Sequence, residues 1–232
     1  MKLTVLIPVF NEESTIGKVL RNLIKIRCPY NLEIIVVNDG STDNSLTEIK
    51  KIKSSKIRVR SNNKNYGKGS AIKSGLKYAR GDFILIQDAD MEYNPNEINN
   101  LLRPIINKKP EESASLAVYG SRFLYNQATI PKVYYLGNRF LTMLTNLIYG
   151  VNLTDMETGY KLIPAVFFKR NKIRSDHFDI EPEITAKLLK NGFKIIEVPI
   201  SYRGRSHLAG KKLTLKDAFG AIAAVTYYRF FN

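Results

Sequence analysis

The sequence predicts an α/β protein whose mostly parallel sheet carries helices on both faces. Short apolar, β-branched runs alternate with segments of helical periodicity four times in the first half of the chain, which is typical of parallel sheets. Each run is apolar on both of its faces, as expected for a strand covered on two sides. The run at 83–86 also ends in Asp88 and Asp90, and a buried strand has no structural use for charge there.

The elements of the first half follow one another closely along the chain. Apolar residues three and four positions apart, such as Ile16, Val19 and Leu23, predict the first helix. We assign a turn to Gly67, in front of the third helix, and Pro95 favours the first turn of the fourth. Strands are expected at 3–9, 33–37, 57–60 and 83–86, and helices over the apolar positions of 16–24, 46–52, 71–79 and 95–102.

The second half is less regular than the first. Strands are expected at 115–119 and 194–200, and helices at 133–151 and at 183–191, the latter closed by Gly192. An apolar tail helix at 215–231 completes a pair of C-terminal amphipathic helices. Because no linker or internal repeat separates the halves, we predict one domain, 1–232, whose first half looks like a nucleotide-binding unit.

Composition excludes several classes of protein. The single Cys28 excludes an internal disulfide, two histidines argue against a structural zinc site, and no apolar run is long enough to predict a membrane span. The net charge of +15 suggests a polyanionic partner, which includes nucleic acid, an anionic membrane surface and phosphorylated substrates. A bias towards lysine on solvated helix faces explains much of the same excess.

The acidic residues after 83–86 predict a metal site. Asp88, Asp90 and Glu92 repel one another unless a cation neutralises them, and carboxylate oxygens suit Mg²⁺ or Mn²⁺. In open α/β sheets, ligands lie at the carboxyl ends of strands. A metal held by few side chains completes its shell with phosphate oxygens, so the sequence predicts a diphosphate substrate. The alternative is a helix cap or solvated turn, which accounts for most isolated Asp-x-Asp patterns.

Two glycine patterns bear on the cofactor. The first strand is followed by Pro8, Phe10 and Glu12 and not by Gly-x-Gly-x-x-Gly, which argues against a dinucleotide. The Gly-Lys-Gly at 67–69 lacks the Ser or Thr of a phosphate-binding P-loop. Neither pattern predicts a redox cofactor.

Three motifs in register give a more specific indication. The turn at 8–12, the segment 37–43 (Val-Asn-Asp-Gly-Ser-Thr-Asp) and the acidic cluster resemble the family 2 glycosyltransferases of the Rossmann-like GT-A fold. The resemblance implies that the first two segments hold the nucleoside and the third holds metal and sugar diphosphate. The residues implied for the nucleoside are Pro8, Phe10, Glu12, Val37 and Asp39, and those for metal and sugar phosphate are Asp88, Ala89, Asp90 and Glu92.

The second half narrows the resemblance to the polyprenyl-phosphate branch, which includes the dolichol-phosphate mannosyltransferases. The segments that carry it are 120–123 (Gly-Ser-Arg-Phe), 155–161 (Asp-Met-Glu-Thr-Gly-Tyr-Lys), 178–183 (Phe-Asp-Ile-Glu-Pro-Glu) and 197–200 (Glu-Val-Pro-Ile). The basic loop 204–213 departs from that branch in its interior, so the resemblance leaves the sugar and the base open.

The resemblance also implies roles for the charged residues. Arg122, Arg205, Lys211 and Lys212 are expected to bind the leaving diphosphate or the acceptor phosphate. Asp90, Arg122 and Asp155 are the expected catalytic residues. A phosphate acceptor is already anionic and needs no strong base, so Asp155 is expected to orient the acceptor.

The function implied is a metal-dependent, inverting transfer of a hexose of the mannose or glucose class. The donor is GDP-mannose or a UDP-sugar, and the acceptor is a polyprenyl (dolichyl) phosphate. The resemblance thus makes 1–110 the nucleotide-sugar half of the domain and 111–232 the acceptor half. The expected location is cytoplasmic, peripheral to the inner face of the cell membrane, with contact through the helices at 133–151 and 215–231. Those helices could instead belong to the core or to a dimer interface. A glycan hydroxyl acceptor is the first alternative function, and a basic nucleic-acid-binding protein is a remote one, because no nucleic-acid module accompanies the charge.

Overall fold

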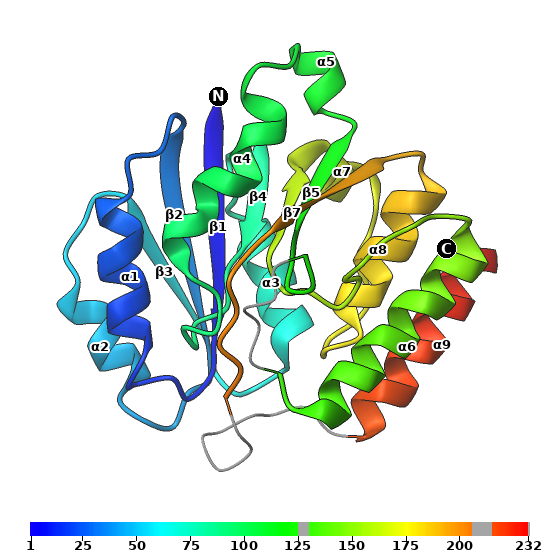
Figure 1. Ribbon diagram of the computed structural model, residues 1–232. Coiled ribbons are helices and arrows are strands. Elements are labelled where there is room, and N and C mark those ends of the chain that lie inside the picture. The colour runs from blue at the N-terminus through cyan, green and yellow to red at the C-terminus, as the bar shows by residue number, and fades with distance from the viewer. Residues whose placement is uncertain (125–129, 206–214, 232) are drawn as a thin grey trace.

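The fold is a seven-stranded mixed sheet, seen in a computed structural model that describes residues 1–124, 130–205 and 215–231. The strands run in the order β3-β2-β1-β4-β6-β5-β7 (Figure 1). All of them are parallel to their neighbours except β6, which is antiparallel to β4 and β5. The strands are β1 Lys2–Val9, β2 Asn31–Asp39, β3 Ile57–Asn62, β4 Phe83–Ile86, β5 Leu116–Ser121, β6 Lys161–Pro164 and β7 Lys194–Pro199.

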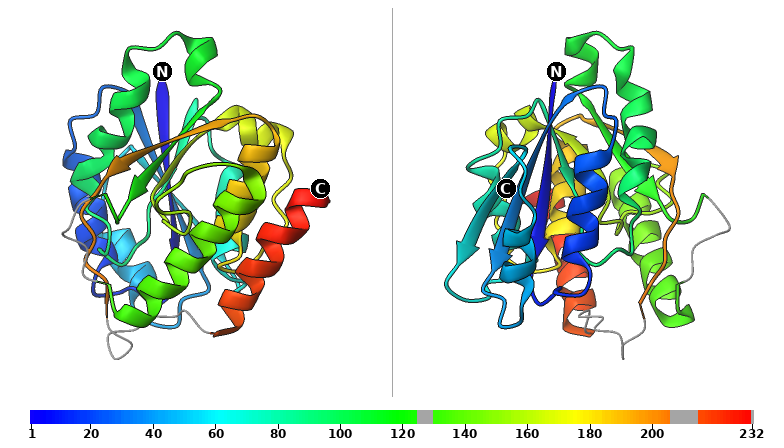
Figure 2. Two further views of the ribbon diagram at one scale, coloured as in Figure 1. Left: turned by 45° about the vertical axis from the view of Figure 1, so that its right-hand side comes forward. Right: turned by 90° about the vertical axis from the view of Figure 1, so that its left-hand side faces the viewer.

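Helices cover both faces of the sheet, which confirms the predicted fold class (Figure 2). They are α1 Ile16–Lys25, α2 Ser45–Lys51, α3 Lys68–Leu76, α4 Ile98–Ile106, α5 Pro110–Ser113, α6 Lys132–Tyr149, α7 Ala165–Arg170, α8 Ile180–Lys190 and α9 Leu215–Phe230, with a 3₁₀ turn, η1, at Pro95–Glu97. The helix expected from Pro95 therefore begins as a 3₁₀ turn and continues as α4.

Alternation along the strands divides the core into two apolar layers. In β1, Leu3 and Val5 pack with α1 and α4, whereas Leu6 packs with α3 and α8. Successive side chains of a strand point to opposite faces, so an entirely apolar strand supplies both layers. The apolar runs of the sequence thus explain the central strands.

Strand β6 is the strand that the sequence analysis missed, and the short helices α5 and α7 were missed as well. Strand β6 is four residues long, lies between β4 and β5, and begins with Lys161, whose side chain is fully buried. A short run that opens with a lysine resembles a loop when only the sequence is considered. Its burial depends on an ion pair with Glu181.

Helices α6 and α9 lie side by side, on the flank of the molecule away from α1 and α2 (Figures 1 and 2). Leu141 of α6 and Val225 of α9 share a small apolar cluster, and Tyr228 of α9 packs near Ala186 of α8. One face of the tail helix therefore belongs to the core. In the described parts of the chain, no helix is both long and apolar enough to cross a membrane.

Candidate active site

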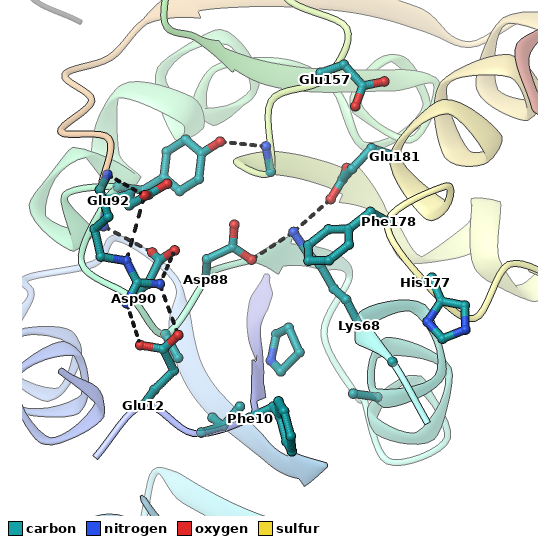
Figure 3. Close-up of a pocket in the computed structure, with 18 of the residues that line it drawn as sticks. Phe10, Glu12, Lys68, Asp88, Asp90, Glu92, Glu157, His177, Phe178 and Glu181 are labelled. Carbon is teal, nitrogen blue, oxygen red and sulfur yellow. Dashed lines mark hydrogen bonds and ion pairs between the residues drawn. The ribbon is translucent and has the colours of Figure 1, made fainter. Parts of the chain in front are cut away.

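A pocket of about 550 Å³ opens at the carboxyl ends of β1, β2 and β4 (Figure 3). The turn after β1, the loop after β4 and the first residues of α3 form one part of its wall. The segment before β6, the start of α8 and the chain after β7 close the other part. The residues of the wall that carry the argument below are Phe10, Glu12, Asp39, Lys68, Asp88, Asp90, Glu92, Arg122, Glu157, Glu181 and Arg205.

Asp39 shapes the pocket beside Pro8 and Phe10. Its carboxylate accepts hydrogen bonds from the backbone N–H groups of Tyr66 and Gly67, at 3.0 and 2.8 Å. Gly67 has a φ of +99°, and a Cβ there would lie 2.4 Å from His177, so a turn without a side chain is needed. This confirms the turn assigned to Gly67 and fixes the entry into α3.

Arg205 is the cation that the carboxylates of Glu12, Asp90 and Glu92 share. Its guanidinium meets both carboxylate oxygens of Glu12 at 3.0 Å and Oδ2 of Asp90 at 3.1 Å. Its Nε lies 3.7 Å from Glu92, which also accepts hydrogen bonds from the Arg205 backbone N–H and from the Tyr202 hydroxyl. Burial, Asp88 and Glu92 together raise the pKa of Asp90 to about 7.

Lys68 holds the other end of the cluster. Its ammonium group lies 2.8 Å from Asp88 and 3.0 Å from Glu181 (Figure 3). Lys161 reaches Glu181 from the other side at 2.6 Å. Burial alone would lower the pKa of Lys68, but Asp88 and Glu181 outweigh burial and raise it. Two lysines thus neutralise the buried carboxylate of Glu181 and the partly exposed carboxylate of Asp88.

Asp155 lies behind Arg122 and does not line the pocket. The two side chains form a forked pair, with Nε–Oδ2 at 2.7 Å and Nη2–Oδ1 at 2.6 Å. The Arg122 backbone N–H also donates to Asp155, at 2.9 Å. Asp155 is fully buried, and its own N–H donates to Glu197. The pair fixes the orientation of Arg122, which does reach the pocket.

The donor chemistry of the cluster fits a hard divalent cation. Asp88, Asp90 and Glu92 offer carboxylate oxygens at one strand end, and burial, followed by the charges of Asp88 and Glu92, raises the pKa of Asp90. Over the described ranges, no three His, Cys, Asp or Glu side chains already form a metal-binding group. Lys68 and Arg205 bind the carboxylates instead, so a metal ion would have to exchange with Arg205.

The structure brings most of the predicted site residues together. Pro8, Phe10, Glu12, Asp39, Asp88, Ala89, Asp90, Glu92, Arg122 and Arg205 line the pocket. Val37 does not line the pocket, because its side chain points into the apolar layer with Ile35. Lys211 and Lys212 lie outside the described residues.

Sequence reasoning missed several residues of the wall. The sequence analysis gives Lys68 no role, because the Gly-Lys-Gly at 67–69 does not form a P-loop motif. Glu157 and Glu181 stood inside quoted motifs without a role, and Tyr93 and Tyr202 gave no signal. The signal that could have found Lys68 is a lysine at the start of a helix that follows a strand end, where anions bind.

The family comparison and the fold together define a glycosyltransferase of the GT-A fold. Residues 4–170 match the profile of glycosyl transferase family 2, and the chain belongs to that family. An uncharacterized protein of Methanocaldococcus jannaschii is 35% identical over 90% of this chain and 93% of its own. The UDP-N-acetylglucosamine–dolichyl-phosphate N-acetylglucosaminyltransferase of Methanococcus voltae is 29% identical over 84% of this chain and 83% of its own.

Solved structures agree with the fold. Glucosyl-3-phosphoglycerate synthase from Mycobacterium tuberculosis, in complex with UDP, has a TM-score of 0.77 at 19% identity and covers all of this chain and 81% of its own. The same synthase was solved with Mn²⁺, UDP and glucosyl-3-phosphoglycerate, at a TM-score of 0.76, 19% identity and the same coverage of both chains. At such identity the likeness shows the fold.

Proposed function

We propose that the protein transfers a hexose from a nucleotide diphosphate sugar to a polyprenyl phosphate, with inversion and with help from Mg²⁺ or Mn²⁺. The observation that carries the proposal is the cluster of Asp88, Asp90 and Glu92 at the strand ends, between an apolar wall at Phe10 and a second acidic wall at Glu157 and Glu181. The curated relative of Methanococcus voltae, named for transfer to dolichyl phosphate, supports the acceptor class.

The residues have distinct tasks in this proposal. Phe10 and Asp39 would hold the nucleoside, and Asp88, Asp90 and Glu92 would hold the metal. A bound divalent cation supplies charge that stabilises the departing diphosphate. Arg122, held by Asp155, supplies a fixed guanidinium that binds phosphate oxygens. The acceptor phosphate attacks as an anion, so no residue of the pocket has to remove a proton first.

Helix α6 supports a lipid acceptor. Tyr134 and Asn138 of α6 line the pocket. On another face of the helix, apolar side chains three and four residues apart are exposed: Val133, Leu136, Phe140, Met143 and Leu147, of which Leu147 is 82% exposed. Lys132 and Arg139 are exposed on the same helix, and it contains no acidic residue. Such a surface suits an anionic membrane interface.

The direct test is a transfer assay. The protein is incubated with GDP-mannose, UDP-glucose or UDP-N-acetylglucosamine, a short-chain polyprenyl phosphate and MnCl₂, and lipid-linked sugar is measured. The proposal expects product with at least one donor and none when EDTA replaces the metal. Transfer to a glycan hydroxyl but not to the lipid phosphate would contradict the proposed acceptor.

Arg205→Ala is expected to strengthen Mn²⁺ binding by about tenfold in the absence of nucleotide. The guanidinium is a cation bound to the same carboxylates, and removing it ends the competition. The same variant should transfer sugar more slowly, because it has lost a phosphate-binding group. Manganese titration checks the first effect. Arg203→Ala is the matched control, since this exposed side chain lies two residues away. Equal Mn²⁺ affinity in both variants would show that Arg205 does not compete.

Leu136→Asp combined with Met143→Asp should abolish flotation with liposomes that contain anionic phospholipid. These side chains are 66% and 63% exposed, so the changes should lower the stability of the protein little. A charge among the exposed apolar residues of α6 opposes insertion of the helix into the membrane interface. Ile106→Asp on α4, at another exposed apolar position, is the control and should float like the wild type. Flotation of the double variant at the wild-type level would show that the exposed apolar residues of α6 do not bind the membrane.

A further inference from the structure

Glu157 is a pocket-lining carboxyl with an unused oxygen. Its Oε1 is buried and, within the described chain, has no hydrogen-bond partner. The neighbouring cations are bound elsewhere: Lys161 contacts Glu181, and Arg122 contacts Asp155. Buried polar atoms in folded proteins nearly always have a partner, and leaving one without a partner is costly. A carboxyl of this kind in the wall of a pocket marks a contact that a ligand completes.

The backbone around Glu157 is held rigidly. The Thr158 hydroxyl donates to the carbonyl of Gly120 at 2.7 Å, and the Gly159 N–H donates to the Tyr93 hydroxyl at 2.8 Å. A Cβ on Gly159 would lie 2.5 Å from Oδ2 of Asp88, so the segment passes directly against the acidic cluster. Glu157 is therefore placed before any ligand arrives, as a specific contact requires.

The charge state of Glu157 suits a neutral hydroxyl. Burial raises the pKa of its carboxyl to about 7, with Lys161 acting in the opposite direction and Glu181 adding to the rise. A carboxyl with this pKa is present in both protonation states near neutrality, so it can accept or donate a hydrogen bond. A phosphate would be repelled by Glu157 in its charged form, whereas a sugar hydroxyl would not.

The position of Glu157 along the pocket points to the donor sugar. Figure 3 shows Phe10 and Glu157 at opposite ends of the drawn wall, with Asp88 between them. A nucleotide diphosphate sugar has its base at one end, its diphosphate in the middle and its sugar at the other. With the nucleoside at Phe10 and the diphosphate at Asp88, the sugar extends towards Glu157. This step rests on the proposed function.

We propose that Glu157 is a specificity-determining residue, which hydrogen-bonds a hydroxyl group of the transferred hexose. It recognises the sugar part of the donor and not the nucleoside diphosphate. It is the far wall of the donor site, and its contact adds to sugar nucleotide affinity without adding to that of UDP or GDP alone.

The test compares sugar nucleotides with nucleoside diphosphates. Wild type, Glu157→Ala and Glu157→Gln are titrated in MnCl₂ with UDP, GDP, UDP-glucose, UDP-N-acetylglucosamine and GDP-mannose. Glu157→Ala should lower the affinity for the sugar nucleotide that binds the wild type by about tenfold or more. The affinity for the matching nucleoside diphosphate should change by less than about twofold. The glutamine amide can still hydrogen-bond a hydroxyl, so Glu157→Gln should recover most of the loss. Glu111→Ala, an exposed carboxyl on α5, should bind every probe as wild type does.

Two results would overturn the assignment. Equal losses for diphosphate and sugar nucleotide would make Glu157 a structural residue, and unchanged sugar nucleotide affinity in Glu157→Ala would remove it from the donor site. If the alanine variant does not fold, Glu157→Met, which keeps the length without the hydrogen bond, takes its place under the same criteria. A wild type that binds none of the sugar nucleotides would contradict the proposed function together with this assignment.

Discussion

Asp90→Asn is expected to lower metal-dependent sugar transfer by about a thousandfold, which corresponds to several kcal/mol of lost transition-state stabilisation. Asp90 lies at the centre of the acidic cluster, between Asp88 and Glu92, and the amide would no longer attract a cation. Its fold should survive the change. Burial and the two neighbouring carboxylates raise the pKa of Asp90 to about 7, so ionised Asp90 opposes folding and the neutral amide does not.

The matched control for Asp90 is Asp82→Asn. Asp82 is exposed at the amino end of the same strand, β4, where its carboxylate accepts a hydrogen bond from the Lys2 backbone N–H. The control should transfer sugar at the wild-type rate. Initial rates of lipid-linked product and melting temperatures check both variants. Wild-type turnover in Asp90→Asn would remove the acidic cluster from the reaction.

Asp155→Asn is expected to lower the free energy of unfolding by about 3 kcal/mol, because it leaves the buried guanidinium of Arg122 without a counter-ion. The forked geometry cannot be reproduced by an amide, whose nitrogen has no lone pair to offer the guanidinium. Asp155 acts on the pocket through Arg122. The double variant Asp155→Asn, Arg122→Met should therefore lose less turnover than the sum of the losses in the two single variants.

Glu48→Gln is the control for this stability effect. It removes an exposed ion pair with Lys51, which is worth less than about 1 kcal/mol. Urea unfolding of Asp155→Asn, Glu48→Gln and the wild type measures the difference. If Asp155→Asn unfolds at the same urea concentration as Glu48→Gln, the forked pair does not hold this part of the pocket together. Additive losses in turnover would mean that Asp155 has a role of its own.

The first half of the fold could be predicted because each of its strands and helices shows its own apolar pattern within a short stretch of sequence. The apolar runs that became β1, β2 and β4 are buried on both faces, and periodic helices follow them. Local patterns did not predict strand β6, because the strand begins with Lys161. The burial of this lysine depends on Glu181, twenty positions further along the chain. An ion pair between distant positions leaves no mark in a local window.

The same reason explains which site residues were found. Asp88 and Asp90 were predicted because two carboxylates after a buried strand are unusual by themselves. The position of Arg205 between Glu12 and Asp90 joins residues more than a hundred positions apart. Lys68 was set aside because its local pattern is weak, although it pairs with Asp88 and Glu181. Val37 was assigned to the nucleoside from its motif, whereas strand alternation turns it into the core.

Calorimetric titration of the wild-type protein with UDP and GDP, each with MnCl₂ and with EDTA, tests the central claim most directly. That claim is that the carboxylates at the end of β4 hold a divalent cation together with a nucleotide diphosphate. The account predicts binding of at least one nucleotide in MnCl₂ and a loss of about tenfold or more in EDTA, since the cation offsets the repulsion between carboxylates and diphosphate. Equal binding in EDTA, or no binding of either nucleotide, would contradict it.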